Sequence, residues 1–314
     1  MKQAYSILLY YCYTHIESPE AFREAHHQYC IENGLRGRII IAQEGINGTL
    51  SGSTTACEKY MHTLKVDPRF AHTHFKVSAH TQHAFQKLHV RVKSEIVHAG
   101  LPHIHPQQQT APYVTPKELQ QLRKETGVVL LDVRSNYEHK LGKFRGAVTL
   151  DIDHFRAFST QIDKLAPFKN KQIITYCTGG VKCEKASAYL QENGFHNVYQ
   201  LQGGIIQYGI DTDGQDFEGT CYVFDQRLTT PINEIDPVII SHCYVCYTPC
   251  ERMVNCANAA CNRHVPLCNA CADNLEGACS LTCKRHPQKR FYDGTGYYAT
   301  KMNGYNPYKG VPRK

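Results

Sequence analysis

The stretch from Ile173 to Leu190 reads IITYCTGGVKCEKASAYL, and its order of residue types decides the fold of the segment around it. It begins with a short run of strand-forming residues, Ile173–Tyr176, and it ends in a pattern typical of a helix. Between the two lies a loop with Cys177 at its start and two glycines after it. A strand that passes through a short loop into a helix is the repeating unit of a parallel sheet covered by helices.

The same alternation of strand and helix continues on both sides of this stretch. The pattern predicts three strands, at Val128–Val133, Ile173–Tyr176 and Val198–Leu201, and three helices, at 116–126, 183–193 and 204–209. We therefore predict an α/β domain over residues 114–215, with a doubly wound parallel sheet and helices on both faces.

Residues 1–97 carry a different pattern. Strand-like runs and helix-like runs follow one another in the order βαββαβ, with closing strands expected near 75–78 and 88–97. This order is typical of a ferredoxin-like α+β domain with an antiparallel sheet. Residues 98–113 hold three prolines and three consecutive glutamines, a composition that favours neither helix nor strand, so we predict a linker there.

The features of an activated cysteine come together in the loop Cys177-Thr178-Gly179-Gly180-Val181-Lys182. Backbone N–H groups at a helix N-terminus carry partial positive charge and stabilise a thiolate, which is the nucleophilic form of cysteine. The two glycines let successive N–H groups converge on one anion, and Lys182 adds a full positive charge. A buried structural thiol is the alternative, but it needs neither the glycines nor the cation. We therefore predict that Cys177 is catalytic.

Residues on both sides of this loop resemble a rhodanese domain. Asp132–Glu138 and Gly142–Ala147 resemble its front half, and Tyr176–Ala186 and Leu201–Gly204 resemble its back half. The resemblance implies a loop that is used for persulfide chemistry. The related dual-specificity phosphatases need an arginine six positions after the cysteine, and Cys183 stands there, which argues against a phosphatase.

A resemblance that covers nearly the whole chain is to the bacterial tRNA uridine hydroxylase family. Three blocks carry it in the same order, namely Ile41–Thr49, Leu88–Val97 and Gly219–Asp225 followed by a cysteine-rich end. The resemblance implies oxygen-dependent hydroxylation of the wobble uridine of tRNA to 5-hydroxyuridine, with molecular oxygen as co-substrate and Cys177 as the catalytic residue. Lys182 departs from the family pattern, which has arginine there; lysine keeps the charge but lacks the planar fork of the guanidinium.

Two other functions stay open at this point, because the chemistry of an activated thiolate does not by itself choose among them. One is a rhodanese-type sulfurtransferase that carries a persulfide on Cys177. The other is a non-catalytic RNA-binding adaptor with a metal module. No glycine-rich dinucleotide fingerprint opens a helix, so neither flavin nor nicotinamide is expected.

Two features near the loop have both a functional and a structural interpretation. Cys183 is a possible resolving cysteine for an oxidised Cys177, but we favour its interpretation as a small residue that packs the helix. Asp132 and Arg134 end a predicted strand beside the cysteine strand, and we interpret them as a structural ion pair.

The C-terminal region, residues 216–314, is dominated by cysteine. Of the fifteen cysteines in the chain, nine lie between Cys243 and Cys283, and the chain lacks the features of a short secreted disulfide protein. Two pairs have CxxC spacing and two are looser, which predicts two structural zinc ions with four thiolates each. The eight predicted ligands are Cys243, Cys246, Cys256, Cys261, Cys268, Cys271, Cys279 and Cys283. An interleaved arrangement, in which the first pair joins the third and the second joins the fourth, is compatible with the spacing but not determined by it.

Positive charge is concentrated at the C-terminal end. Residues 284–314 hold eight Lys or Arg and one acid, with tyrosines between them, a composition suited to phosphate neutralisation and base stacking. We predict tRNA as the partner and a cytoplasmic location, and no apolar run is long enough for a membrane span. The candidate RNA-binding residues are Arg91, Lys93, Arg285, Lys289 and Arg290. The oligomeric state does not follow from the sequence.

Overall fold

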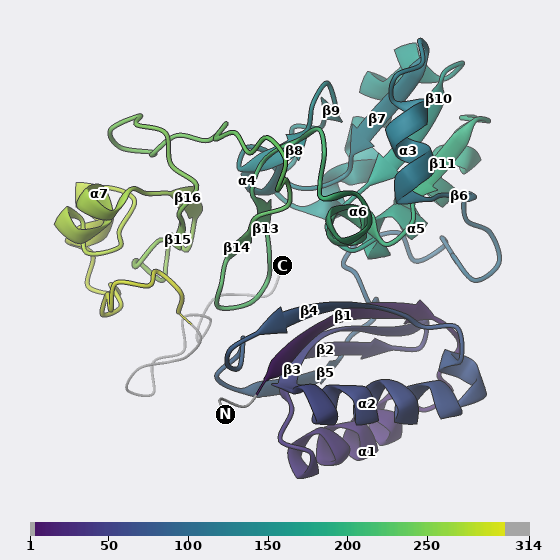
Figure 1. Cartoon of the computed structure of the whole chain (residues 1–314), viewed down its shortest axis with the longest axis horizontal. Helices are drawn as coiled ribbons and strands as arrows, with labels where there is room; N and C mark the ends of the chain where they lie inside the picture. The colour runs from purple at the N-terminus through teal and green to yellow at the C-terminus, as the bar shows by residue number, and fades with distance from the viewer. Residues whose placement is uncertain (1–3, 299–314) are drawn as a thin grey trace.

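The computed structural model describes residues 4–298, and the elements fall into three parts along the chain (Figure 1). The last sixteen residues, which carry half of the cations predicted for the basic tail, lie outside the described residues. No helix within 4–298 is long and apolar enough to cross a membrane.

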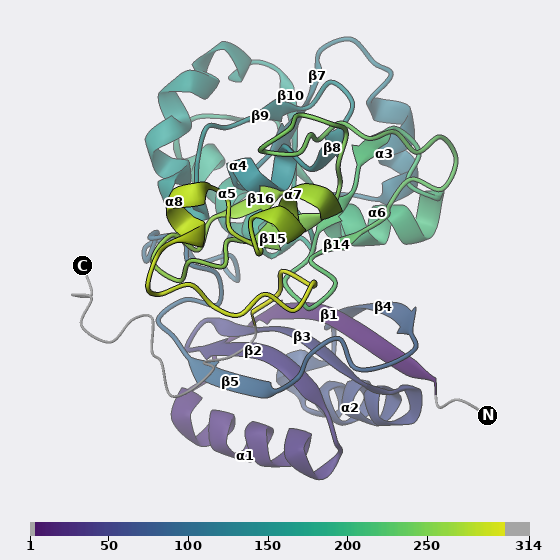
Figure 2. The ribbon, with the colours of Figure 1, turned by 90° about the vertical axis from the view of Figure 1, so that its left-hand side faces the viewer.

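The N-terminal part is one five-stranded sheet with two helices on one face (Figures 1 and 2). The strands follow the order β4-β1-β3-β2-β5, and the helices α1 and α2 pack against the face that carries the apolar core. The bounds are β1 Tyr5–Tyr13, α1 Pro19–Glu32, β2 Arg36–Ala42, β3 Gly45–Ser53, α2 Thr54–Val66, β4 His74–His80 and β5 Leu88–Val92. The predicted βαββαβ order is confirmed through β4, after which β5 adds a fifth strand, and the ferredoxin-like class is confirmed.

Two details of that prediction were wrong. β5 pairs with β2 in parallel, so the sheet is mixed and not purely antiparallel. The strand also ends at Val92, five residues before the predicted end. Near the predicted end of the strand, the backbone of Ile96 forms its hydrogen bonds with side chains. Ile96 N–H donates to Glu44 Oε1 at 2.8 Å, and the Asn47 amide donates to the Ile96 carbonyl at 2.9 Å.

The middle part is a doubly wound domain with a five-stranded parallel sheet in the order β6-β11-β10-β7-β9. Alternate side chains of its central strands enter two cores, with Leu131 and Ile173 on one face and Leu130 and Ile174 on the other. The strands are β6 Tyr113–Val114, β7 Val128–Asp132, β9 Val148–Thr149, β10 Gln172–Tyr176 and β11 Val198–Leu201. The covering helices are α3 Pro116–Leu122, α4 Asn136–His139, α5 Val181–Glu192 and α6 Gly204–Thr212, with a 3-10 segment at Phe155–Phe168.

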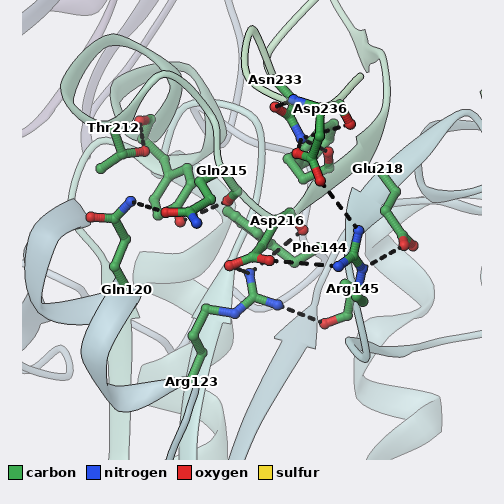
Figure 3. Close-up of polar contacts among 12 residues, drawn as sticks. Gln120, Arg123, Phe144, Arg145, Thr212, Gln215, Asp216, Glu218, Asn233 and Asp236 are labelled. Carbon is green, nitrogen blue, oxygen red and sulfur yellow. Dashed lines mark hydrogen bonds and ion pairs between the residues drawn. The ribbon is translucent and has the colours of Figure 1, made fainter. Parts of the chain in front are cut away.

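The C-terminal part begins as an extension of this domain. β12 Phe217–Gly219 pairs with β8 Gly142–Phe144, and ion pairs hold the junction, with Arg145 to Glu218 at 2.8 Å and Arg123 to Asp216 at 3.5 Å (Figure 3). Two small hairpins and two short helices follow. They are β13 Cys221–Tyr222 with β14 Thr229–Thr230, β15 Met253–Asn255 with β16 His264–Pro266, α7 Asn269–Asn274 and α8 Leu281–Lys284.

Candidate active site and metal centres

Cys177 lies directly after β10 and before α5, as the strand–loop–helix pattern predicted. Its side chain is buried, with 1% of the residue exposed. Gly180 takes a left-handed conformation with φ of 101°, which turns its N–H toward the sulfur, and this N–H donates to Cys177 Sγ at 3.1 Å. One of the backbone donors predicted for this loop, the Gly180 N–H, therefore contacts the sulfur.

The surroundings of Cys177 favour its thiolate. Burial alone would raise the pKa of Cys177, but the thiol of Cys183, the charge of Lys182 and the N–H groups of Lys182 and Gly180 together lower it from 9.0 to about 6. For Cys183 the balance is reversed, since burial and the neighbouring Cys177 raise its pKa well above 9.0. The thiol of Cys183 thus favours the thiolate form of Cys177. Whether Cys183 also resolves an oxidised Cys177 stays a prediction.

Charged residues beside the loop divide into two pairs. Asp132 and Arg134 are both fully buried and meet through several hydrogen bonds, including Arg134 Nη2 to Asp132 Oδ2 at 2.6 Å. Arg134 also donates to the carbonyl of Gly142 at 2.6 Å, which agrees with the predicted structural role. Lys182 donates to the buried carboxylate of Glu138 at 2.7 Å, and this contact fixes the ammonium at the edge of the loop.

The N-terminal sheet covers the loop with its helix-free face. One cross-strand row of that face runs from Lys76 on β4 through Leu9 and Thr49 to Arg38 on β2. Lys76 is fully buried, and its ammonium donates to the carbonyl of Gly179 at 2.9 Å. Leu9 packs so closely on the loop that a Cβ at Gly179 would lie 2.8 Å from its methyl carbon. The active site is therefore assembled from two domains.

The contribution of Lys76 to the candidate active site was not predicted from the sequence. Lys76 stands in a strand whose alternate positions are also polar, namely His74, Ser78 and His80, so nothing local distinguishes it. Burial lowers the pKa of Lys76 to about 8, and the negative charges of Cys177 and Glu184 oppose that fall.

Two consecutive residues of α5 fasten the domains together. Glu184 is buried and accepts hydrogen bonds from the phenols of Tyr11 and Tyr113, both at 2.7 Å. Lys185 is also fully buried and lies between two carboxylates of the N-terminal domain, at 2.8 Å from Glu44 and 2.7 Å from Glu95. These contacts keep the sheet seated on the loop.

Two cavities lie along this junction, and Lys76 lines both of them. One of about 210 Å³ is lined by Thr178 of the loop, by Leu9 and Lys76 of the sheet and by Phe224. The other, of about 310 Å³, is lined by the phenol rings of Tyr11, Tyr13 and Tyr113 and by His72, His74 and Glu184 among others. Both offer room beside the loop for a planar polar molecule.

The exposed part of the same sheet face is basic. Arg91 on β5 and Lys93 just beyond it are exposed, and Arg36 and Arg38 of β2 lie on the same face with His89. The predicted residues Arg91 and Lys93 thus belong to a larger group of cations, called the basic sheet face below.

The three cations predicted at the C-terminal end differ in their exposure and in their contacts inside the protein. Arg285 is exposed, whereas Lys289 forms an ion pair with Glu276. Arg290 donates to the carbonyl of Cys256 at 2.5 Å and to Asn262 Oδ1 at 2.9 Å, and it lies over the ring of Tyr298. Their binding to RNA stays a prediction, and for Lys289 and Arg290 it competes with contacts inside the protein.

Comparison with known proteins identifies the family. The chain is 57% identical over 309 residues to a protein of Cytophaga hutchinsonii named tRNA uridine(34) hydroxylase, which covers 98% of this chain and 99% of that one. It is 44% identical over 299 residues to a protein of the same name from Bacillus cytotoxicus, covering 93% and 91% of the two chains. The chain belongs to the tRNA uridine(34) hydroxylase family.

Family models divide this hydroxylase-family chain into three segments. A UPF0176 acylphosphatase like domain matches residues 5–96, a rhodanese-like domain matches residues 115–210 and a rhodanese C-terminal model matches residues 218–284. A solved rhodanese-like domain from Anabaena is similar to 40% of this chain and 88% of its own, with 22% identity and a TM-score of 0.31.

The cysteine-rich part of this family member gathers its thiols into two groups. One holds Cys243, Cys246, Cys268 and Cys271, and the other holds Cys256, Cys261, Cys279 and Cys283, with the sulfurs of each group within 4.8 Å of one another. The eight predicted ligands are thus brought together, and the grouping is the interleaved one that spacing alone did not determine. Cys250 lies outside both groups.

The donor set of each group fits a tetrahedral zinc ion. Four sulfurs per group match the ligands that structural zinc sites use. Backbone N–H groups also point at the sulfurs, with Cys268 N–H donating to Cys243 Sγ and Cys279 N–H donating to Cys256 Sγ, each at 3.4 Å. Such bonds stabilise thiolates and orient them toward a metal.

Proposed function

We propose that this chain hydroxylates uridine 34 of tRNA at C5, giving 5-hydroxyuridine, with molecular oxygen as co-substrate and Cys177 as the catalytic residue. The observation that carries the proposal is the 57% identity over 98% of the chain to a tRNA uridine(34) hydroxylase. At that identity and coverage, the proposal extends to the whole chain and not to its rhodanese domain alone.

The geometry around Cys177 supports a role as nucleophile. A thiolate with a pKa of about 6 is largely ionised near neutral pH, and its burial keeps water away from the reacting centre. Addition of this thiolate to C6 of uracil would place electron density on C5, the carbon that receives the hydroxyl group. Since one atom of O2 enters the base, the other leaves as water, which requires two electrons and two protons from an external reductant.

The basic sheet face supports tRNA as the substrate. Its cations lie on the sheet that covers the catalytic loop, so phosphates bound there would lead a nucleotide toward Cys177. A wobble uridine lies in a single-stranded loop, so its base can be presented without breaking a base pair. We place the reaction in the cytoplasm, where tRNA is modified and thiolates remain reduced.

We further propose that the two cysteine groups hold structural zinc. All four ligands of each site come from the protein, which leaves no open position for a water or a substrate. The metal would then stabilise the C-terminal part, whose helices have only six and four residues.

The proposal is tested by mass spectrometry of tRNA nucleosides from a strain that lacks this chain. We expect 5-hydroxyuridine to disappear, to return with the wild-type chain and to stay absent with Cys177→Ser. Unchanged 5-hydroxyuridine in the deletion strain would falsify the hydroxylase function. Full restoration by Cys177→Ser would instead support the non-catalytic RNA-binding adaptor.

The Gly180 N–H donor at Cys177 Sγ favours a sulfurtransferase as the second candidate, because it would stabilise a persulfide equally well. Transfer of sulfur from thiosulfate to cyanide by the purified chain, lost in Cys177→Ser, would support it. We expect a preparation that hydroxylates tRNA normally to show no transfer of sulfur from thiosulfate to cyanide.

A further inference from the structure

We propose that Phe224 is the stacking surface for the pyrimidine base that is presented to Cys177. The inference rests on the proposed function, since it assigns a binding residue to the RNA substrate. Three observations carry it: the rigidity of the hairpin that holds Phe224, the exposure of its ring, and the groups that surround the ring.

Phe224 lies in the turn of the hairpin formed by β13 and β14, and this turn is held from within. Val223 N–H donates to the Leu228 carbonyl at 2.9 Å, and the buried Asp225 carboxylate accepts from the guanidinium of Arg227 at 2.9 and 2.6 Å. Such a closed turn has few alternative conformations. A base that binds there would therefore meet a surface that is already in place.

The turn is also fastened to the N-terminal domain. Gln226 N–H donates to the carbonyl of Ala84 at 3.0 Å, and Arg38 of the basic sheet face donates to the Phe224 carbonyl at 3.5 Å. In Figure 1 the β13–β14 hairpin reaches from the upper part of the molecule toward the N-terminal sheet. Phe224 is thus fixed between the two domains that build the active site.

The ring of Phe224 is exposed although its neighbours are not. Its exposed fraction is 42%, whereas Val223 is 5% and Leu228 3% exposed. Much of the ring of Phe224 is therefore open to contact by a ligand, on a turn that is already held in place.

The surroundings of the ring define the ligand. The Lys182 ammonium of the catalytic loop lies 5.8 Å from the ring centroid, and the ring of Tyr222 meets it at 5.1 Å with an angle of 81°. Phe224 and Thr178, the residue after Cys177, line the same cavity of about 210 Å³. A flat apolar surface among cations, next to the reactive loop, suits a base that is attached to a phosphate chain.

A pyrimidine nucleotide of single-stranded RNA therefore fits better than a peptide. Stacking on an aromatic ring requires only a π-face, and two cations near this ring match the adjacent phosphates, namely Lys182 at 5.8 Å from the ring centroid and Arg38 at the Phe224 carbonyl. A hydrophobic peptide would bury both cations against apolar side chains, and the cost of desolvating their charge opposes binding.

The test is a photochemical crosslink made with the full-length chain. The probe is an anticodon stem–loop RNA with 5-iodouridine at position 34, because this base crosslinks to aromatic side chains on which it stacks. We expect mass spectrometry to locate the crosslink at Phe224 in the wild type and in Cys177→Ser, and to find most of it lost in Phe224→Leu. A crosslink that maps to another residue, with Phe224→Leu unchanged, overturns the inference.

Affinity for the same RNA provides the second measurement. We expect Phe224→Leu to weaken binding about tenfold, which is typical of the loss of one base–aromatic stack, while Phe224→Tyr binds as the wild type does. The control is Ile31→Ala on α1, whose residue is 53% exposed on the helical side of the N-terminal domain, and it should have no effect. Equal affinities for Phe224→Leu and the wild type overturn the inference.

These measurements separate the inference from the proposed function. Because Cys177→Ser is expected to keep the crosslink, binding of the base is read without the reaction. A crosslink at Phe224 together with unchanged 5-hydroxyuridine in the deletion strain would overturn hydroxylation and not the stacking surface. Normal hydroxylation with no crosslink at Phe224 would overturn only the stacking surface.

Discussion

Lys76 of the N-terminal sheet donates a hydrogen bond of 2.9 Å to the carbonyl of Gly179, two residues after Cys177. The ammonium is fully buried and lies within range of the negative charge of Cys177. The N-terminal domain thus contributes a cation and lining residues to the candidate active site, in addition to the proposed contacts of its basic sheet face with tRNA.

Replacement of this cation is expected to raise the pKa of Cys177. In Lys76→Met, the thiolate loses a nearby positive charge and the Gly179 carbonyl loses its donor. A rise of one unit lowers the thiolate fraction about tenfold at a pH well below the pKa. The measurement is the pH profile of alkylation of the Cys177 peptide by iodoacetamide, followed by mass spectrometry. Lys59→Met, exposed on α2, is the control and should match the wild type.

The activity of the wild type should fall with pH below about 6, because protonation removes the Cys177 thiolate. Above about pH 6, the activity of the wild type should not change with pH until another group titrates. Lys182→Gln removes a charge that lowers the pKa of Cys177, so its profile should shift toward higher pH. The profile of kcat/KM for tRNA hydroxylation measures both, and identical profiles for the two proteins would contradict this account.

Cys183→Ala tests the two interpretations of Cys183. Loss of its thiol removes a hydrogen bond to Cys177, so the alkylation profile of Cys177 should shift to higher pH. If Cys183 is also a resolving cysteine, peroxide treatment of the wild type should give a disulfide between the two, with water released from a sulfenic acid on Cys177. Peptide mapping without reduction detects that disulfide, and its absence would leave Cys183 with the hydrogen-bonding role alone.

The metal content should be two zinc ions per chain, and paired substitutions should reveal how the ligands are grouped. Cys243→Ala with Cys268→Ala affects only one group, so one ion should remain. Cys243→Ala with Cys256→Ala affects both groups, so both ions should be lost. Sequential instead of interleaved pairing predicts the opposite outcomes. Plasma mass spectrometry of the purified proteins distinguishes the two arrangements.

Lys185→Met should destabilise the junction of the two domains. It leaves Glu44 and Glu95 close together without their shared cation, a change that typically costs about 3–5 kcal/mol. The midpoint of urea unfolding measures the loss, and Lys117→Met, exposed on α3, is the control. Lys185→Met combined with Glu95→Gln should recover part of the stability, because one of the two carboxylates is then neutral.

The same contacts predict an acid effect on stability. Burial by itself would raise the pKa of Glu95, but the hydrogen bonds from Lys185 and from backbone N–H groups lower it below its ordinary 4.5. Its contribution is therefore fully present above pH 4.5 and is lost as the pH falls through the lower folded value. In Lys185→Met, this loss should begin at a higher pH than in the wild type.

Much of the fold follows from local patterns in the sequence. The strand-forming run Ile173–Tyr176, the glycines after Cys177 and the helical run that follows each act over a few residues, so they predicted the strand, the loop and the helix. The direction of β5 did not follow from its residues, because a single strand carries no signal for the neighbour it will pair with. Helix α3 likewise ended at Leu122, earlier than its pattern suggested.

The sequence by itself predicted the reactive cysteine, the backbone donors beside it and the eight thiols, because each prediction depends on residue types at short spacing. Only the tertiary structure decided that Lys76 reaches Gly179, that the thiols group in interleaved fashion, and that Phe224 lies beside the loop. These relationships join residues from different domains or from separate turns of the chain. They depend on how finished elements pack against one another, and no local pattern of residues encodes that packing.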